Sequence, residues 1–246
     1  MKNLVGYITT GYPDKNFTAD LALSLSQNGV DSIELGVPFS DPVADGPVIE
    51  KANHKALDLG FKFQDILDVS AQVAGEVDIL WMGYFNLFYQ YQMEKLLPKA
   101  KELGVSGMII PDLPHEEAVL YKELFKSNGV ANIAFVAPTD SAPRIKEVVS
   151  DAQKFIYLVA YAGITGSGKS EDLQGIITSI KEYTQTPVYV GFGVNEKTAK
   201  EKVEGADGVI VGSAFIQILL NETLSHTQKI KECSDLARII KDKINS

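Results

Sequence analysis

Two carboxylates lie close together in the segment IELGVPFSDPVADGP, residues 33–47. Glu34 stands between two apolar residues in a strand-like run, where an ionisable group either points into an enclosed site or is paired. Asp41 and Asp45 follow on a loop that contains Pro and Gly. Two acids in such different surroundings can divide the roles of acid and base between them. The alternative interpretation is a turn capped by Asp41 and a satisfied buried Glu34.

A glycine-rich segment, GITGSGKS at residues 163–170, offers a second kind of chemistry. It fits the nucleotide-binding P-loop pattern G-x-x-x-x-G-K-[ST], with a strand-like run before it and a helical pattern after it. In a P-loop, Lys169 and Ser170 would hold the phosphates and Mg²⁺, yet no later apolar strand ends in the Asp that this metal requires. The later strands end in GFG (191–193) and GSA (212–214), whose backbone N–H groups suit a phosphate in a barrel. We therefore favour a backbone phosphate site over an ATP site.

Other common catalytic groups are scarce. His54, His115 and His226 are the only histidines, and none lies in a strand-end run. Together with the single Cys233 they provide neither a metal-ligand cluster nor a partner for a serine nucleophile. The sequence therefore predicts no metal and leaves proton transfer to carboxylates.

Short apolar runs rich in β-branched and aromatic residues alternate with longer segments of helical periodicity along the whole chain. The strand-like runs are VGYITT, DSIELGV, DILWMGY, GMIIPDL, NIAFVAP, FIYLVAYA, PVYVGFG and GVIVGSA. Continuous apolar runs suit parallel strands that are buried on both faces. The count of roughly eight units, without a linker between them, predicts a single-domain (β/α)8 TIM barrel over residues 1–246 in preference to an open sheet.

A barrel of this kind would bring the candidate groups together, because its active site forms at the carboxyl ends of the strands. Aromatic residues also gather in or just after these strands, at Tyr84, Phe85, Phe88, Tyr157, Tyr161 and Phe192. Aromatic residues there are more often part of the core than of a ligand site. The residues alone thus predict a barrel that binds a phosphorylated, partly apolar substrate and uses carboxylates for proton transfer.

The charge and composition of the chain exclude several classes of partner. Its 246 residues include 32 acidic and 23 basic side chains, a formal net charge of −9. This balance provides no broad basic surface, so we expect neither nucleic-acid nor membrane binding. No apolar run approaches the roughly 20 residues of a membrane helix, and a single cysteine cannot form an internal disulfide. The expected location is the cytoplasm.

The carboxylate segment IELGVPFSDPVADGP resembles the signature of the tryptophan synthase alpha subunit family. Supporting matches follow in order along nearly the whole chain, at YITTGYP, MGYFN, IIPDLP, YLVAYAGITG, VGFGV and VGSA. The resemblance implies a (β/α)8 lyase that cleaves indole-3-glycerol phosphate to indole and glyceraldehyde 3-phosphate. It also implies that the subunit carries no cofactor of its own.

The resemblance assigns roles to individual residues. Glu34 matches the principal acid/base, Asp45 the carboxylate that holds the indole nitrogen, and Tyr157 a position beside the substrate. The positions that line the indole site are matched by Tyr7, Ile109 and Phe192, and Thr165 is a further substrate-binding candidate. The phosphate site is matched by Gly166, Gly193, Gly212 and Ser213.

The resemblance also implies a partner. Family members pair with a pyridoxal phosphate-dependent beta subunit in an alpha2-beta2 assembly, and the beta subunit joins the indole to serine. The loops at residues 41–48 and 163–170 resemble those that contact beta and close over the substrate. Two rival functions stay open, a different phosphate-binding barrel enzyme acting on a sugar phosphate and a non-catalytic activator of beta. A Schiff-base Lys at a strand end would favour the first rival, and the strand runs contain none.

Overall fold

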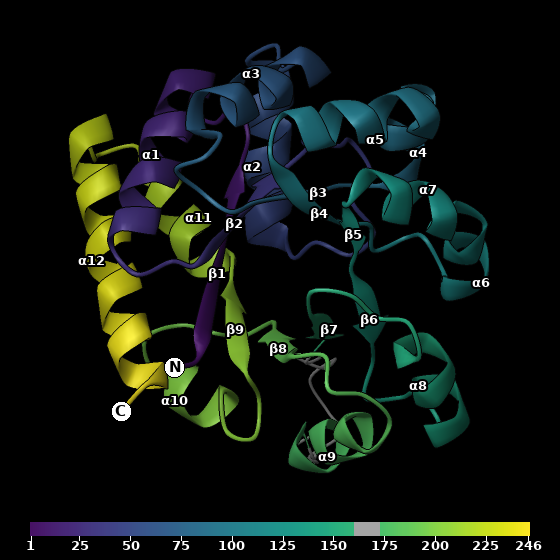
Figure 1. Cartoon of the computed structure of the whole chain (residues 1–246). Coiled ribbons are helices and arrows are strands. Elements are labelled where there is room, and N and C mark those ends of the chain that lie inside the picture. Colours follow the sequence, from purple (N-terminus) through teal and green to yellow (C-terminus); the bar gives the residue numbers. More distant parts are fainter. Residues whose placement is uncertain (160–172) are drawn as a thin grey trace.

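The computed structural model describes residues 1–159 and 173–246, and in this part of the chain nine parallel strands form one continuous sheet (Figure 1). The strands are β1 (Asn3–Thr9), β2 (Ser32–Gly36), β3 (Ile79–Met82), β4 (Val105–Ile109), β5 (Ala131–Asn132), β6 (Ala134–Val136), β7 (Ile156–Val159), β8 (Val188–Gly191) and β9 (Gly208–Val211). Their order in the sheet is β5-β4-β3-β2-β1-β9-β8-β7-β6.

The sheet closes on itself through its two end strands. β5 pairs with β4 at one end and β6 pairs with β7 at the other, yet only Ile133 separates β5 from β6 in the chain. The Ile133 N–H donates to the carbonyl of Met108 at 3.0 Å, which continues the pairing with β4. The predicted strand NIAFVAP is thus one barrel strand in two pieces, and the predicted eight-stranded barrel is confirmed over the described residues.

Helices surround the barrel in the order that the sequence pattern predicts. They are α1 (Lys15–Gln27), α2 (Pro47–Asp58), α3 (Phe63–Val73), α4 (Phe85–Gln90), α5 (Met93–Glu102), α6 (His115–Ala118), the 3-10 helix η1 (Val119–Tyr121), α7 (Lys122–Asn128), α8 (Ala142–Val149), α9 (Leu173–Tyr183), α10 (Ala199–Lys202), α11 (Ser213–Leu219) and α12 (His226–Ile244). The short helix α4 lies between β3 and α5, and two helices, α11 and α12, follow β9.

Local sequence fixes where several of these helices begin. The Asp14 side chain accepts a hydrogen bond from the N–H of Phe17 at 2.9 Å and so caps α1. Ser225 and Gln228 form a reciprocal capping box at the start of α12. Pro47 is the first residue of α2, a position that needs no N–H donor. This last start matters for the site because it sets where the loop after β2 ends.

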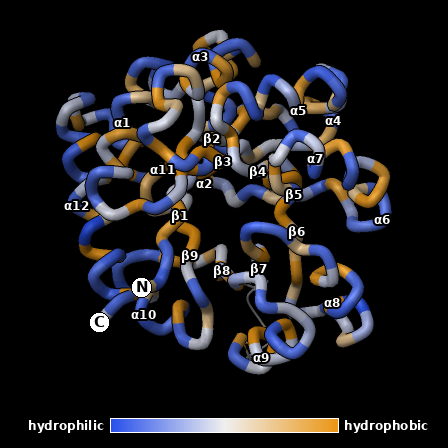
Figure 2. The backbone as a smooth tube through the Cα atoms, in the orientation of Figure 1, coloured by the Kyte–Doolittle hydropathy of each residue, from blue (hydrophilic) through white to orange (hydrophobic). Residues whose placement is uncertain are grey.

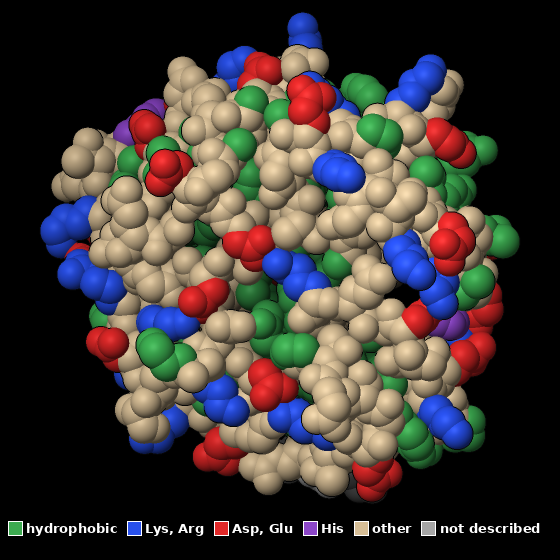
Figure 3. Space-filling view, in the orientation of Figure 1, with side chains coloured by type: hydrophobic (Ala, Val, Ile, Leu, Met, Phe, Trp, Pro, Cys, Tyr) green, Lys and Arg blue, Asp and Glu red, His purple; other side chains and the backbone are tan. Residues whose placement is uncertain are grey.

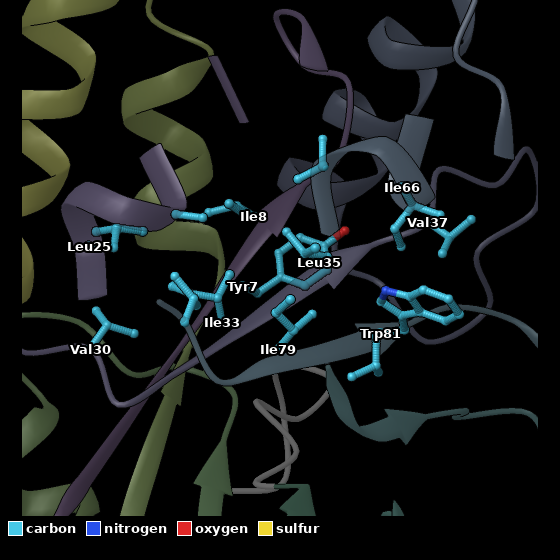
Figure 4. Packing of buried hydrophobic residues seen from close by; sticks show 14 of the residues in the cluster. Tyr7, Ile8, Leu25, Val30, Ile33, Leu35, Val37, Ile66, Ile79 and Trp81 are labelled. Atoms are coloured by element: carbon cyan, nitrogen blue, oxygen red, sulfur yellow. The ribbon is translucent and has the colours of Figure 1, made fainter. Parts of the chain in front are cut away.

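The main core lies between the barrel wall and the helices. Outward-facing side chains of the first strands, including Ile8, Ile33 and Leu35, are fully buried beside Leu25 of α1 and Ile66 of α3 (Figure 4). Apolar residues recur along the strands, whereas apolar and polar residues alternate along the helices (Figure 2). The helices therefore present one apolar side to the sheet and one polar side to water.

The inside of the barrel is filled below the carboxyl ends of the strands. The interior cluster consists of Val5, Leu80, Ile109, Ala131, Ile133, Phe155, Tyr189 and Ile210. Phe155 and Tyr189 stack with ring centroids 4.5 Å apart. Because these side chains fill the barrel interior, a substrate would enter from the carboxyl ends of the strands.

The face of the molecule in Figure 3 has no broad basic area, as the net charge predicts. Acidic and basic side chains are interspersed over the face shown in Figure 3. No helix within the described residues combines the length and apolar character that a bilayer crossing needs.

Candidate active site

Four strands supply the side chains that meet inside the upper part of the barrel. Alternation along each strand turns Tyr7 of β1, Glu34 of β2, Ile109 of β4 and Tyr157 of β7 toward the interior. Tyr7 is the register partner of Glu34 on the neighbouring strand. The charge of Glu34 raises the pKa of both Tyr7 and Tyr157. The predicted convergence of these residues is therefore present.

Glu34 is the most deeply enclosed acid of the group. Its side chain is 2% exposed, and its Oε1 atom has no hydrogen-bond partner among the described residues. Loss of hydration on burial, and then the neighbouring charge of Asp45, raise the pKa of Glu34 to about 8. At neutral pH this carboxyl therefore keeps its proton and can act as an acid.

Asp45 reaches the same place from the loop that joins β2 to α2. It accepts a hydrogen bond from Asn53 Nδ2 at 3.0 Å. Burial raises the pKa of Asp45 to about 6, while hydrogen bonds from Asn53 and Tyr84 limit the rise by favouring the ionised form. At neutral pH Asp45 is thus predominantly a carboxylate, so the site holds one neutral acid and one anion side by side. Two carboxyls whose pKa values differ in this way can divide the roles of acid and base between them.

The Tyr7 side chain fits against β2 only because Gly36 has no side chain. A Cβ atom added at Gly36 would lie 2.3 Å from the Tyr7 hydroxyl oxygen. That hydroxyl accepts from Thr9 at 3.4 Å and donates to Asn53 Oδ1 at 3.5 Å. Burial and the charges of Asp45 and Glu34 hold the pKa of Tyr7 well above its usual range, so the phenol stays neutral.

Tyr157 of β7, three strands along the sheet from β1, also packs against a glycine. Its ring stacks on Phe135 with centroids 5.0 Å apart, and a Cβ atom at Gly191 would lie 2.2 Å from it. Burial and the charges of Glu34 and Asp45 hold its pKa well above the usual range. Tyr157 is therefore a neutral hydrogen-bond donor facing the two acids.

The ends of β8 and β9 present backbone to the same end of the barrel. Phe192 follows β8 with φ of 85°, a conformation that costs a bulky residue about 1–3 kcal/mol, and its side chain is 39% exposed. Gly193 comes next, and Gly212 and Ser213 open α11 after β9. Since β8 and β9 are neighbouring strands, these glycines lie on adjacent loops. Thr165 and Gly166, with the whole segment 163–170, lie outside the described residues.

Several other sequence candidates lie away from the site. Asp41 is exposed, and its carboxylate accepts a hydrogen bond from the Ser40 hydroxyl. The His226 ring packs edge-on against Phe17 at the start of α1. Within the described chain, no group of three or more potential ligand residues could hold a metal ion.

Sequence reasoning missed two residues that hold Asp45 in place. Asn53 is 1% exposed on the inner face of α2, and Tyr84 lies at the start of α4, where its hydroxyl accepts from the N–H of Ala44 at 3.0 Å. Tyr84 was predicted only as a core aromatic. For Asn53 a signal does exist, because a polar residue on the apolar side of a helix, eight positions after a catalytic candidate, needs a buried partner.

Comparisons with known proteins agree with this geometry. Residues 1–245 match the family model described as tryptophan synthase alpha chain. The tryptophan synthase alpha chain of Wolinella succinogenes is 54% identical over 247 residues, which cover 100% of this chain and 97% of the relative. Tryptophan synthase subunit alpha of Legionella pneumophila superimposes with a TM-score of 0.89 and 33% identity, covering 99% of this chain and 93% of that one. A chain of Mycobacterium tuberculosis tryptophan synthase gives a TM-score of 0.90 at 30% identity, with 100% and 93% covered.

Proposed function

The chain belongs to the tryptophan synthase alpha chain family, and we propose that Glu34, Asp45 and Tyr157 form its catalytic centre. As an alpha chain it is the lyase that cleaves indole-3-glycerol phosphate to indole and glyceraldehyde 3-phosphate in tryptophan biosynthesis. One observation carries the proposal about the residues. Glu34 is 2% exposed, with no partner for its Oε1 among the described residues, so burial keeps it protonated at neutral pH while Asp45, hydrogen-bonded to Asn53, is ionised.

The reaction needs one proton delivered and one removed. The bond between C3 of the indole ring and the first side-chain carbon breaks after C3 has been protonated, and the hydroxyl on that side-chain carbon loses its proton as the aldehyde forms. Glu34 gives its proton to C3 and becomes a carboxylate, which then takes the hydroxyl proton. The enzyme finishes in the protonation state in which it began, so a raised pKa suits both halves of the cycle.

Asp45 stabilises the charge that this proton transfer creates. Protonation at C3 leaves the indole ring positively charged, with the charge centred on its nitrogen. A carboxylate that accepts the indole N–H stabilises this cation most strongly when it is ionised and shielded from water. The neutral hydroxyl of Tyr157 faces both acids and orients the side-chain hydroxyls of the substrate.

The remaining assignments rest on their positions at the open end of the barrel and on the family resemblance. We assign Tyr7, Ile109 and Phe192 to the indole ring and Thr165 to substrate binding. The phosphate is assigned to the backbone at Gly166, Gly193, Gly212 and Ser213. Neutral tyrosine and apolar surfaces suit a flat aromatic ring, and glycine N–H groups at strand ends suit an anion.

The alpha chain carries no cofactor of its own and works with a tryptophan synthase beta subunit, which holds pyridoxal phosphate, in an alpha2-beta2 assembly. We propose that residues 1–246 form a single domain. Both ends of the chain support this, because the N–H of Lys2 donates to Asn245 at 2.7 Å. We also propose that the protein works in the cytoplasm, where a lone buried thiol such as Cys233 stays reduced.

The test measures free indole released from indole-3-glycerol phosphate by the purified chain. Glu34→Gln and Asp45→Asn should each lower turnover by about 10²- to 10⁴-fold, since each keeps its shape and loses only its proton or charge. Asp58→Asn, which removes an exposed acid from the end of α2, serves as the control and should keep the wild-type rate. Wild-type turnover by Glu34→Gln would remove that residue from the proposed mechanism.

A further inference from the structure

Asn53 is a buried amide in the middle of α2, where its residue type is unexpected. Its side chain is 1% exposed and shares the inner face of the helix with Ala52 and Ala56. Asn is a poor helix former and a costly group to bury, so its position requires polar partners. The structure supplies two, and both belong to the proposed active site.

We propose that Asn53 is a positioning residue: its amide, oriented by Tyr7, fixes the Asp45 carboxylate where the indole N–H of the substrate binds. This inference rests on the proposed function of Asp45. It extends that function to a residue that does not itself touch the reacting atoms.

The direction of the hydrogen bonds carries the argument. Thr9 donates to the Tyr7 hydroxyl, which leaves the single Tyr7 proton for Asn53 Oδ1. An amide has one accepting end and one donating end, so holding Oδ1 at Tyr7 points Nδ2 at Asp45. Nδ2 donates to Asp45 Oδ2 at 3.0 Å. The wall of the barrel at β1 thus determines how the loop after β2 presents its carboxylate.

The arrangement leaves Asp45 able to bind its ligand. A carboxylate offers about four acceptor positions, and the hydrogen bonds from Asn53 and Tyr84 use only part of them. A neutral amide donor favours the ionised carboxylate without adding a charge that would compete for the indole cation. A lysine or arginine at position 53 would pair with Asp45 and weaken its attraction for the substrate.

The charged and titratable groups around Asp45 come from several elements. Glu50 of α2 opposes its ionisation, whereas Asn53 and Tyr84 favour it, and Glu34 of β2 is still protonated in the pH range where Asp45 titrates. Tyr7 of β1 and Tyr157 of β7 are neutral and face it from the barrel. Among the described residues, Asn53 and Tyr84 are the two groups that favour the anion, so the loss of Asn53 should raise the pKa of Asp45.

The experiment compares the pH dependence of kcat/KM for indole release in three variants and the wild type. Asn53→Ala should move the acidic limb from near pH 6 upward by about one pH unit, because a hydrogen bond to an ionised group is lost. At pH 7 this corresponds to a loss of about twofold in kcat/KM, and the loss approaches tenfold below pH 6. Tyr7→Phe keeps the ring but frees the amide, and it should move the same limb upward by less.

Ser70→Ala is the matched control. Ser70 is a fully buried polar residue on α3 that accepts from the Trp81 indole N–H at 2.9 Å, and it lies outside the site. Its loss should lower the melting temperature as Asn53→Ala does, while the acidic limb stays at the wild-type pH.

Two outcomes would overturn the inference. An acidic limb that stays at the wild-type pH in Asn53→Ala, alongside a lowered melting temperature, would reduce Asn53 to a structural anchor of the loop. If Asn53→Ala does not fold, an unshifted limb in Tyr7→Phe decides the matter in the same way. Wild-type turnover in Asp45→Asn would instead refute the proposed function of Asp45, which separates that failure from this one.

Discussion

Replacing Glu34 by Gln should stabilise the protein at neutral pH while it removes most of the activity. In the unfolded chain a Glu carboxyl loses its proton near about pH 4.3, whereas burial raises the pKa of Glu34 to about 8 in the folded protein. Between these values the folded state binds one more proton than the unfolded state. The free energy of unfolding therefore falls by about 1.4 kcal/mol for each pH unit, and the fall ends above pH 8. An amide cannot ionise, so the variant escapes this loss.

Urea unfolding of both proteins at two pH values, about 5.5 and 7.5, measures the effect. The variant's free energy of unfolding, relative to wild type, should rise by about 2–3 kcal/mol between the two conditions. The cost of burying the amide is the same at both pH values, so it cancels when the two conditions are compared. The titration of Asp45 cancels as well, because Asp45 is present in both proteins. The prediction is refuted if the unfolding free energy of the variant minus that of the wild type is the same at both pH values.

Further predictions concern the site as a whole. The kcat/KM for indole release should follow a bell-shaped pH profile with limbs near 6 and 8, where Asp45 and Glu34 titrate; a flat profile from pH 5 to 9 would contradict the assignment. Gly191→Ala places a Cβ atom 2.2 Å from the Tyr157 ring, so turnover should fall and stability should drop by about 1–3 kcal/mol; wild-type kinetics would show that the ring moves freely. An indole-alkyl phosphate at about 100 times its Kd should raise the free energy of unfolding by roughly 2.7 kcal/mol and so raise the melting temperature. Mg-ATP should leave the melting temperature unchanged. Gly212→Asp should abolish the increase caused by the indole-alkyl phosphate, because it places a carboxylate against the phosphate. Saturable stabilisation by Mg-ATP would favour a P-loop at residues 163–170.

The barrel and its two acids could be predicted from the sequence because both depend on local patterns. Continuous apolar runs followed by helical periodicity indicate parallel strands covered by helices, and that pattern repeats without a break. A carboxylate inside such a run is conspicuous because burial without a partner is costly. Glu34 and Asp45 therefore stood out before any contact was known.

The partners of Asp45 could not be identified in the same way: the sequence indicates that Asn53 needs a buried polar partner, but not which residues provide it. In the sequence Asn53 is one polar residue on a predicted helix. Only the folded barrel brings the Tyr7 hydroxyl to the Asn53 oxygen, while the Asn53 nitrogen donates to Asp45. Tyr84 reads as a core aromatic, and only the path of the loop after β2 brings the Ala44 N–H to its hydroxyl. Hydrogen bonds between side chains far apart in sequence leave no periodic signal.

Backbone detail at the strand ends was also beyond sequence reasoning. The run NIAFVAP has no glycine, and proline comes only at its end, yet the strand divides at Ile133 because β4 and β7 pair with different parts of it. In GFG the glycines are the natural candidates for a left-handed conformation, but Phe192 adopts one as well.

The most direct test of the account observes the two acids themselves. Carbon-13 NMR of the side-chain carboxyls, with Glu34→Gln and Asp45→Asn used to assign the resonances, follows each acid from pH 4 to 9. The account predicts that Glu34 titrates near pH 8 and Asp45 near pH 6, so that one is neutral and the other ionised between these values. A Glu34 resonance that titrates in the ordinary range, near about pH 4.3, would contradict the central claim that this acid starts the reaction with its proton in place.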